Sequence, residues 1–131
     1  MAKINIFWFR RDLRLDDNAG LYHALNSKLP VLPLFIFDTK ILDKLENPKD
    51  ARVEFIHNAL TELNSKLNAA GSNLLVKHGS PVEIWKELIA ENDIGEVFTN
   101  SDYEPYAIER DSAIKQLLAE KQISFSTYKD H

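Results

Sequence analysis

Five short apolar segments recur along the chain, and longer amphipathic stretches separate them. The apolar segments are rich in Ile, Leu, Val and aromatic residues, and the second of them is nearly continuous. They span residues 3–9, 31–38, 73–78, 96–100 and 123–128. Continuous apolar runs of this length are typical of strands that are buried on both faces, as in parallel sheets. The pattern therefore predicts five strands.

The stretches between these segments carry apolar residues at helical spacing. The longest stretch has an apolar residue every three or four positions, at Val53, Ile56, Leu60, Leu63 and Leu67. This spacing predicts a helix with one apolar face, for which Asp50 is a plausible N-cap and Gly71 a plausible C-terminal stop.

Three further helices are predicted from their starting residues. Ser80 and Pro81 suit the cap and first position of a helix whose inward-facing residues would be Val82, Trp85, Leu88 and Ile89. Pro105 opens another helix, with Ala107, Ile114, Leu117 and Leu118 expected to be buried. A shorter helix begins near Asn18, with Asp17 or Asn18 as its N-cap.

Strands and helices thus alternate from one end of the chain to the other. This order predicts an α/β fold: a single Rossmann-like, three-layer domain with a mostly parallel five-stranded sheet and helices on both faces. The length of 131 residues suits one domain, 1–131, and residues 39–50 form one long polar connection. Because the sequence stops just after the fifth strand, we expect a fragment of a longer protein.

Composition narrows the possible chemistry. The net charge of −4 argues against a nucleic-acid surface within this segment, and the absence of cysteine excludes disulfides and thiolate catalysis. No apolar run reaches the length of a membrane span or a signal sequence, so a cytoplasmic protein without a membrane partner is predicted. The four glycines build no dinucleotide fingerprint or phosphate loop, and the four histidines show no metal-ligand spacing.

Charged and polar residues cluster directly after three of the predicted strands. In α/β sheets, ligands bind beyond the carboxyl ends of the strands, near the point where the strand order reverses. Residues 10–17, 37–38 and 100–105 would therefore form the rim of a binding cleft. A purely structural interpretation remains open, in which the arginines of the first loop pair with its aspartates. Those residues are Arg10, Arg11, Arg14, Asp12, Asp16 and Asp17.

Four motifs carry a more specific resemblance. They are WFRRDLRLDDN at 8–18, PLFIFD at 33–38, Arg52 with Phe55, and NSDYEPYAIERD at 100–111. Their order and spacing resemble the N-terminal α/β domain of the photolyase/cryptochrome family, and the similarity covers essentially the whole chain. Members of this family are flavoproteins. Photolyases use blue or near-ultraviolet light to repair pyrimidine dimers in DNA, and cryptochromes signal.

The resemblance implies a division of labour between two domains. FAD and the DNA groove would belong only to a C-terminal helical domain, which this chain lacks and which would be its partner in the parent protein. This chain would be inactive alone and would bind a light-harvesting antenna chromophore. The implied antenna contacts are Arg10, Phe37, Asp38, Arg52, Asn100, Asp102 and Glu104, while Arg11, Asp12 and Arg14 would mainly hold their loop and the contact between the two domains.

The chromophore and the biological role are less closely specified. Tyr106 and Ala107 stand where folate-binding members similar to the enterobacterial type carry an Asn-Glu pair, so a deazaflavin or flavin antenna is favoured over folate. The main hypothesis is the antenna domain of a DNA photolyase, which meets damaged DNA through the parent and not through this domain. The alternatives are the same domain of a cryptochrome, or a stand-alone nucleotide- or partner-binding module.

Overall fold

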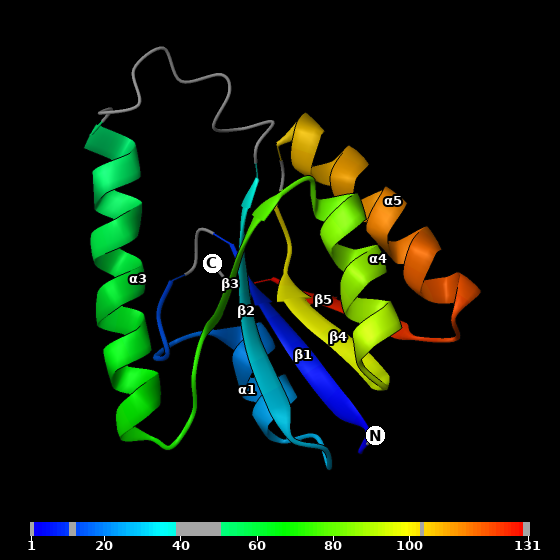
Figure 1. The fold of residues 1–131 in the computed structure, drawn as a ribbon, viewed down its shortest axis with the longest axis horizontal. Coiled ribbons are helices and arrows are strands. Elements are labelled where there is room, and N and C mark those ends of the chain that lie inside the picture. Colours follow the sequence, from blue (N-terminus) through cyan, green and yellow to red (C-terminus); the bar gives the residue numbers. More distant parts are fainter. Residues whose placement is uncertain (1, 11–12, 39–50, 103, 130–131) are drawn as a thin grey trace.

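A computed structural model describes residues 2–10, 13–38, 51–102 and 104–129, without the side chains of 51–54. Strands and helices alternate along the chain as predicted (Figure 1). The strands are β1 (Ile4–Phe9), β2 (Val31–Asp38), β3 (Leu75–Gly79), β4 (Ile94–Asn100) and β5 (Ser124–Tyr128). The helices are α1 (Ala19–Leu25), α3 (Ala51–Ala69), α4 (Pro81–Glu91) and α5 (Pro105–Glu120).

All five strands lie in one parallel sheet with the order β3-β2-β1-β4-β5. The chain first builds outward from β1 through β2 to β3, and then returns to the other side of β1 for β4 and β5. The strand order therefore reverses between β1 and β4. Because every strand is parallel, the carboxyl ends of β1, β2 and β4 lie at the same edge of the sheet, which confirms the predicted fold class.

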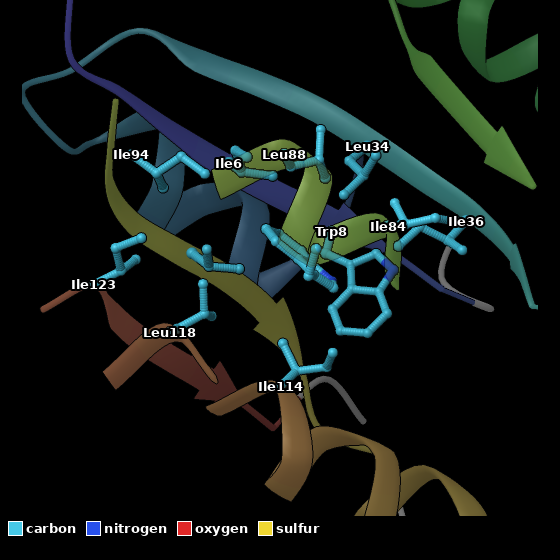
Figure 2. Packing of buried hydrophobic residues seen from close by; sticks show 12 residues of the cluster. Ile6, Trp8, Leu34, Ile36, Ile84, Leu88, Ile94, Ile114, Leu118 and Ile123 are labelled. Carbon is cyan, nitrogen blue, oxygen red and sulfur yellow. The ribbon is translucent and has the colours of Figure 1, made fainter. Parts of the chain in front are cut away.

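Side chains of the central strands alternate between two hydrophobic clusters. One cluster lies on the side of α4 and α5 and contains Ile6, Trp8, Leu34, Ile36, Ile84, Trp85, Leu88, Ile94, Val97, Ile114, Leu118 and Ile123 (Figure 2). The other lies on the side of α1 and α3 and contains Phe7, Phe9, Leu21, Ala24, Phe35, Phe37, Leu60, Leu63, Leu67 and Phe98. This two-residue period explains why β1 and β2 read as continuous apolar runs: both of their faces are buried.

The burial of the outer strands and the starts of β3 and β4 differ from the prediction. β3 and β5 contain only half-buried and exposed residues, because each pairs with only one neighbour. β3 also begins two residues later than predicted, where Leu75 pairs with Leu34, and β4 begins two residues earlier, where Ile94 pairs with Ile4. Strand pairing, which the local pattern does not contain, decides these limits.

Most of the predicted helix ends are confirmed. Asn18 is the N-cap of α1, and its side-chain oxygen accepts a hydrogen bond from the backbone N–H of Leu21 at 3.1 Å. Gly71, at φ +85°, follows the end of α3 in a conformation that favours glycine. Ser80 occupies the cap position of α4 but makes no side-chain capping bond. Asp50, like the connection 39–50, lies outside the described residues.

The helical positions predicted to face the sheet are buried to different degrees. In α4, Trp85 and Leu88 are fully buried, whereas Val82 and Ile89 are only partly buried against the same cluster. In the part of the chain that the structure describes, no helix has both the length and the apolar character needed to cross a membrane.

Candidate functional site

Arg10 follows the last residue of β1 and reaches across the edge of the sheet to helix α5. Its Nη1 donates a hydrogen bond to Oδ2 of Asp111 at 2.6 Å, and the two side chains are only 7% and 16% exposed. The partner lies 101 residues away in the sequence. For Arg10, the structure therefore shows a partner on a distant helix, which the interpretation of local pairing within its own loop does not include.

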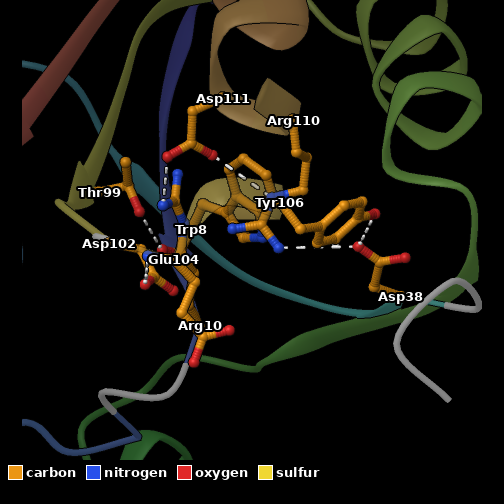
Figure 3. A network of polar contacts seen from close by, with 9 residues as sticks. All are labelled: Trp8, Arg10, Asp38, Thr99, Asp102, Glu104, Tyr106, Arg110 and Asp111. Atoms are coloured by element: carbon orange, nitrogen blue, oxygen red, sulfur yellow. Dashed lines mark hydrogen bonds and ion pairs between the residues drawn. The ribbon is translucent and has the colours of Figure 1, made fainter. Parts of the chain in front are cut away.

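The same helix also contacts the end of β2. The hydroxyl of Tyr106 donates a hydrogen bond to Oδ2 of Asp38 at 2.6 Å, and Nη1 of Arg110 lies 3.7 Å from the same oxygen. Nε of Arg110 lies 3.4 Å from Oδ1 of Asp111, which completes the connection to Arg10. We call Arg10, Asp38, Tyr106, Arg110 and Asp111 the edge network (Figure 3).

The two-residue period of the strands explains why these side chains meet. Trp8 and Ile36 both belong to the cluster under α4 and α5, and Arg10 and Asp38 follow each of them by two residues. Both charged side chains therefore leave the sheet on the side of α5. Tyr106 and Arg110 lie four residues apart and share one face of that helix.

The ring of Trp8 packs against the two arginines of the edge network. The guanidinium carbon of Arg10 lies 4.4 Å from the centre of its ring, and that of Arg110 lies 5.1 Å away. Arg110 also lies 5.7 Å from the ring of Tyr106. Guanidinium groups at such distances are attracted to the negative face of an aromatic ring, and the attraction strengthens where water is excluded.

Tyr106 is held as a neutral hydrogen-bond donor. Burial of the phenol, its hydrogen bond to Asp38 and the negative charge of that carboxylate all raise the pKa of Tyr106 well above its usual value. Each of these factors disfavours the charged phenolate. At neutral pH the hydroxyl therefore keeps its proton and continues to donate it to Asp38.

Phe37 lies on the opposite side of the sheet from Asp38. Its ring stacks on His78 with 4.5 Å between the ring centres, and His57 of α3 lies 5.1 Å away at a tilt. Both histidines are exposed. An antenna role for Phe37 remains a prediction, and it would require contact from the α3 side.

The side chain of Asn100 forms hydrogen bonds at the start of α1. Its side-chain oxygen accepts a hydrogen bond from the backbone N–H of Gly20 at 2.7 Å, and its amide donates to Oδ1 of Asn18 at 2.7 Å. Nearby, Oδ1 of Asp102 accepts a bond from the backbone N–H of Glu104 at 3.2 Å, which orders the start of α5. Antenna contacts by Asn100, Asp102 and Glu104 remain predictions.

The remaining predicted residues of the first loop and α3 are only partly described. Arg14 donates a hydrogen bond to the backbone oxygen of Asp17 at 2.9 Å, as a loop-holding residue would. Arg11 and Asp12 lie outside the described residues, as does the side chain of Arg52.

Sequence reasoning did not assign roles to Tyr106, Arg110 and Asp111, although all three lie in a motif that it used. The available signal was the four-residue spacing on the helix together with the alternation of the strands. Within the described ranges, no three His, Asp or Glu side chains gather as metal ligands. The edge network instead presents guanidinium, carboxylate and phenol groups, which suit the recognition of a polar aromatic ligand.

The family model for DNA photolyase matches residues 5–131. The chain belongs to the DNA photolyase family. Relatives include a deoxyribodipyrimidine photo-lyase from Synechococcus, which is 36% identical over 118 residues, covering 90% of this chain and 24% of the relative. Drosophila melanogaster cryptochrome-1 is 34% identical, with coverage of 92% and 23%. The chain thus spans about a quarter of the length of these relatives.

A solved structure supports the same family and fold. The archaeal photolyase from Sulfolobus tokodaii is 35% identical and superimposes with a TM-score of 0.85, covering 98% of this chain and 29% of that chain. That structure holds two FAD molecules, with the implication of a novel light-harvesting cofactor in that photolyase.

Proposed function

We propose that this chain is the antenna-binding domain of a DNA photolyase and that it binds a flavin-type chromophore at the edge network. The observation that carries the proposal is the convergence of Arg10, Asp38 and Arg110 at the carboxyl edge of the sheet, next to the reversal of strand order. This is the position where parallel α/β sheets bind ligands. The Sulfolobus relative with two FAD molecules supports a flavin as the ligand class.

The side chains at this edge match the polar groups of a flavin ring. Nη2 of Arg110 is buried and has no hydrogen-bond partner among the described residues, so it could donate to a ring carbonyl. The carboxylate of Asp38 could accept a hydrogen bond from a ring N–H, while Tyr106 holds that carboxylate in place. When bound, the chromophore would supply absorption of light and transfer of the energy to a second flavin.

The wider activity belongs to a longer parent protein in this proposal. The parent would bind FAD in a helical domain, take the pyrimidine dimer out of the duplex and split it in light. The net charge of −4 fits a domain that does not itself contact DNA. The similarity to Drosophila cryptochrome-1 supports a photoreceptor as the second candidate. Light-dependent dimer repair by the full-length protein would separate the two.

The antenna proposal is tested by titrating the purified chain with FMN, FAD, a deazaflavin and a methenyl-folate and following chromophore fluorescence. We expect one of the flavin-type compounds to bind more tightly than folate. Asp38→Ala should weaken that binding about 10- to 150-fold, because a charged hydrogen bond is lost. Glu62→Gln, an exposed carboxylate on α3, is the control and should change nothing. Preferred folate binding, or an unchanged affinity in Asp38→Ala, would contradict the proposal.

A further inference from the structure

Trp8 combines two properties that matter next to a light-absorbing ligand. The ring is only 2% exposed and lies below the edge network, so its electronic surroundings are set by the protein and not by water. Arg110 contacts both this ring, at 5.1 Å, and the carboxylate of Asp38, at 3.7 Å. A single guanidinium therefore separates an indole from the candidate chromophore contact (Figure 3).

Indole is among the most easily oxidised side chains, and a photoexcited flavin is a strong one-electron oxidant. Trp8 at this position could lose one electron to the excited flavin, which would leave an indole radical cation and a flavin reduced by one electron. The electron would then return to Trp8, so no net reaction occurs. The excitation energy would nevertheless be lost as heat before it could be transferred.

We propose that Arg10 and Arg110 prevent this loss by making Trp8 a poor electron donor. The inference rests on the proposed antenna function. The two guanidinium carbons lie 4.4 and 5.1 Å from the ring centre, so each positive charge directly opposes the formation of a cation on the indole. Both arginine side chains are more than nine-tenths buried, which limits screening by water.

Asp111 and Asp38 hold the two arginines in place beside Trp8. Asp111 binds Arg10 at 2.6 Å, and Asp38 lies 3.7 Å from Arg110. These carboxylates hold the two guanidinium groups against the Trp8 ring. They also pair with the two positive charges, which allows the charges to be buried. Both carboxylates contact guanidinium nitrogen atoms, so the arginines are the charged groups against the aromatic face. Their negative charge weakens the effect on Trp8 without cancelling it.

The test compares the fluorescence lifetime of bound FMN in the wild-type chain and three variants. We expect Arg110→Met to shorten the lifetime several-fold, because the charge opposing oxidation is gone. Arg110→Lys keeps a charge and should stay near the wild-type lifetime. Adding Trp8→Phe to Arg110→Met should restore the lifetime, because phenylalanine is a poor donor. An unchanged lifetime in Arg110→Met would overturn the proposal. A short lifetime that persists in the double variant would also overturn it.

A second measurement does not require flavin binding. Trp8 and Trp85 are the only two tryptophans, so Trp85→Phe leaves Trp8 as the sole indole. Pulse radiolysis of the flavin-free protein then measures the one-electron potential of Trp8 with and without Arg110→Met. A lower potential in Arg110→Met supports the proposal, and equal potentials overturn it. Failure of FMN to bind, seen in the titration, would count against the antenna function alone.

Discussion

Replacing Asp111 with Asn removes the negative charge beside Arg10 while keeping the size of the side chain. The Nη1–Oδ2 distance is 2.6 Å, and the side chains are 7% and 16% exposed. Removing one partner of a buried ion pair costs about 3–5 kcal/mol. Asp111 keeps some contact with water and an asparagine oxygen can still accept a hydrogen bond, so we expect the free energy of unfolding to fall by about 2–3 kcal/mol.

Urea unfolding followed by far-ultraviolet circular dichroism measures this change. For a chain of this length, the expected fall corresponds to a decrease in Tm of roughly 7–11 °C. The matched control is Glu62→Gln, which breaks a pair with Lys66 at 3.6 Å on the exposed surface of α3. That change should cost less than about 0.5 kcal/mol. Equal, small effects of the two substitutions would refute the conclusion that the edge network is a buried electrostatic unit.

Three other substitutions test the core, a close contact and the half-buried phenol of Tyr106. Trp85→Ala should cost about 3–5 kcal/mol in urea unfolding because the ring is 0% exposed, and a cost below about 1 kcal/mol would contradict this packing. Gly20→Ala should lower the free energy of unfolding by about 1–3 kcal/mol, although alanine favours helices. The added Cβ would lie 2.7 Å from Oδ1 of Asn100 and 2.8 Å from the ring of Phe7, and a more stable variant would refute this. Because the folded pKa of Tyr106 is raised, its contribution to stability is present at neutral pH and is lost as the pH rises above about 10. Tyr106→Phe should remove this part of the alkaline decline in urea midpoints, and an identical decline in both proteins would contradict it.

The local sequence pattern predicts much of this fold, because a strand that is buried on both faces of the sheet has a continuous run of apolar residues. β1 and β2 are continuous apolar runs, and Asn18 and Gly71 mark helix ends through their own backbone and side-chain chemistry. The limits of β3 and β4 were predicted less accurately. Their limits depend on which residues of the neighbouring strand they pair with, as Leu75 does with Leu34.

The structure brings Arg10 and Asp38 of the predicted binding edge together and adds residues that were not predicted. Parallel strands place Arg10 and Asp38 at one edge of the sheet, and this follows from the order of elements alone. Which residues they contact does not follow, because Asp111 is 101 residues from Arg10 and Tyr106 is 68 from Asp38. The sequence around Arg10 therefore does not identify Asp111 as its partner.

The amino-acid sequence by itself determined the α/β class, the parallel sheet and the edge at which polar groups gather, because these follow from periodicity and from the geometry of parallel strands. Only the tertiary structure decided how those polar groups are used. Strand alternation sends Asp38 toward α5 and Phe37 toward α3, although the two residues are neighbours in the chain. The docking of α5 over the sheet then brings Arg110 between Trp8 and Asp38. Such contacts arise from the packing of distant elements, which no local pattern records.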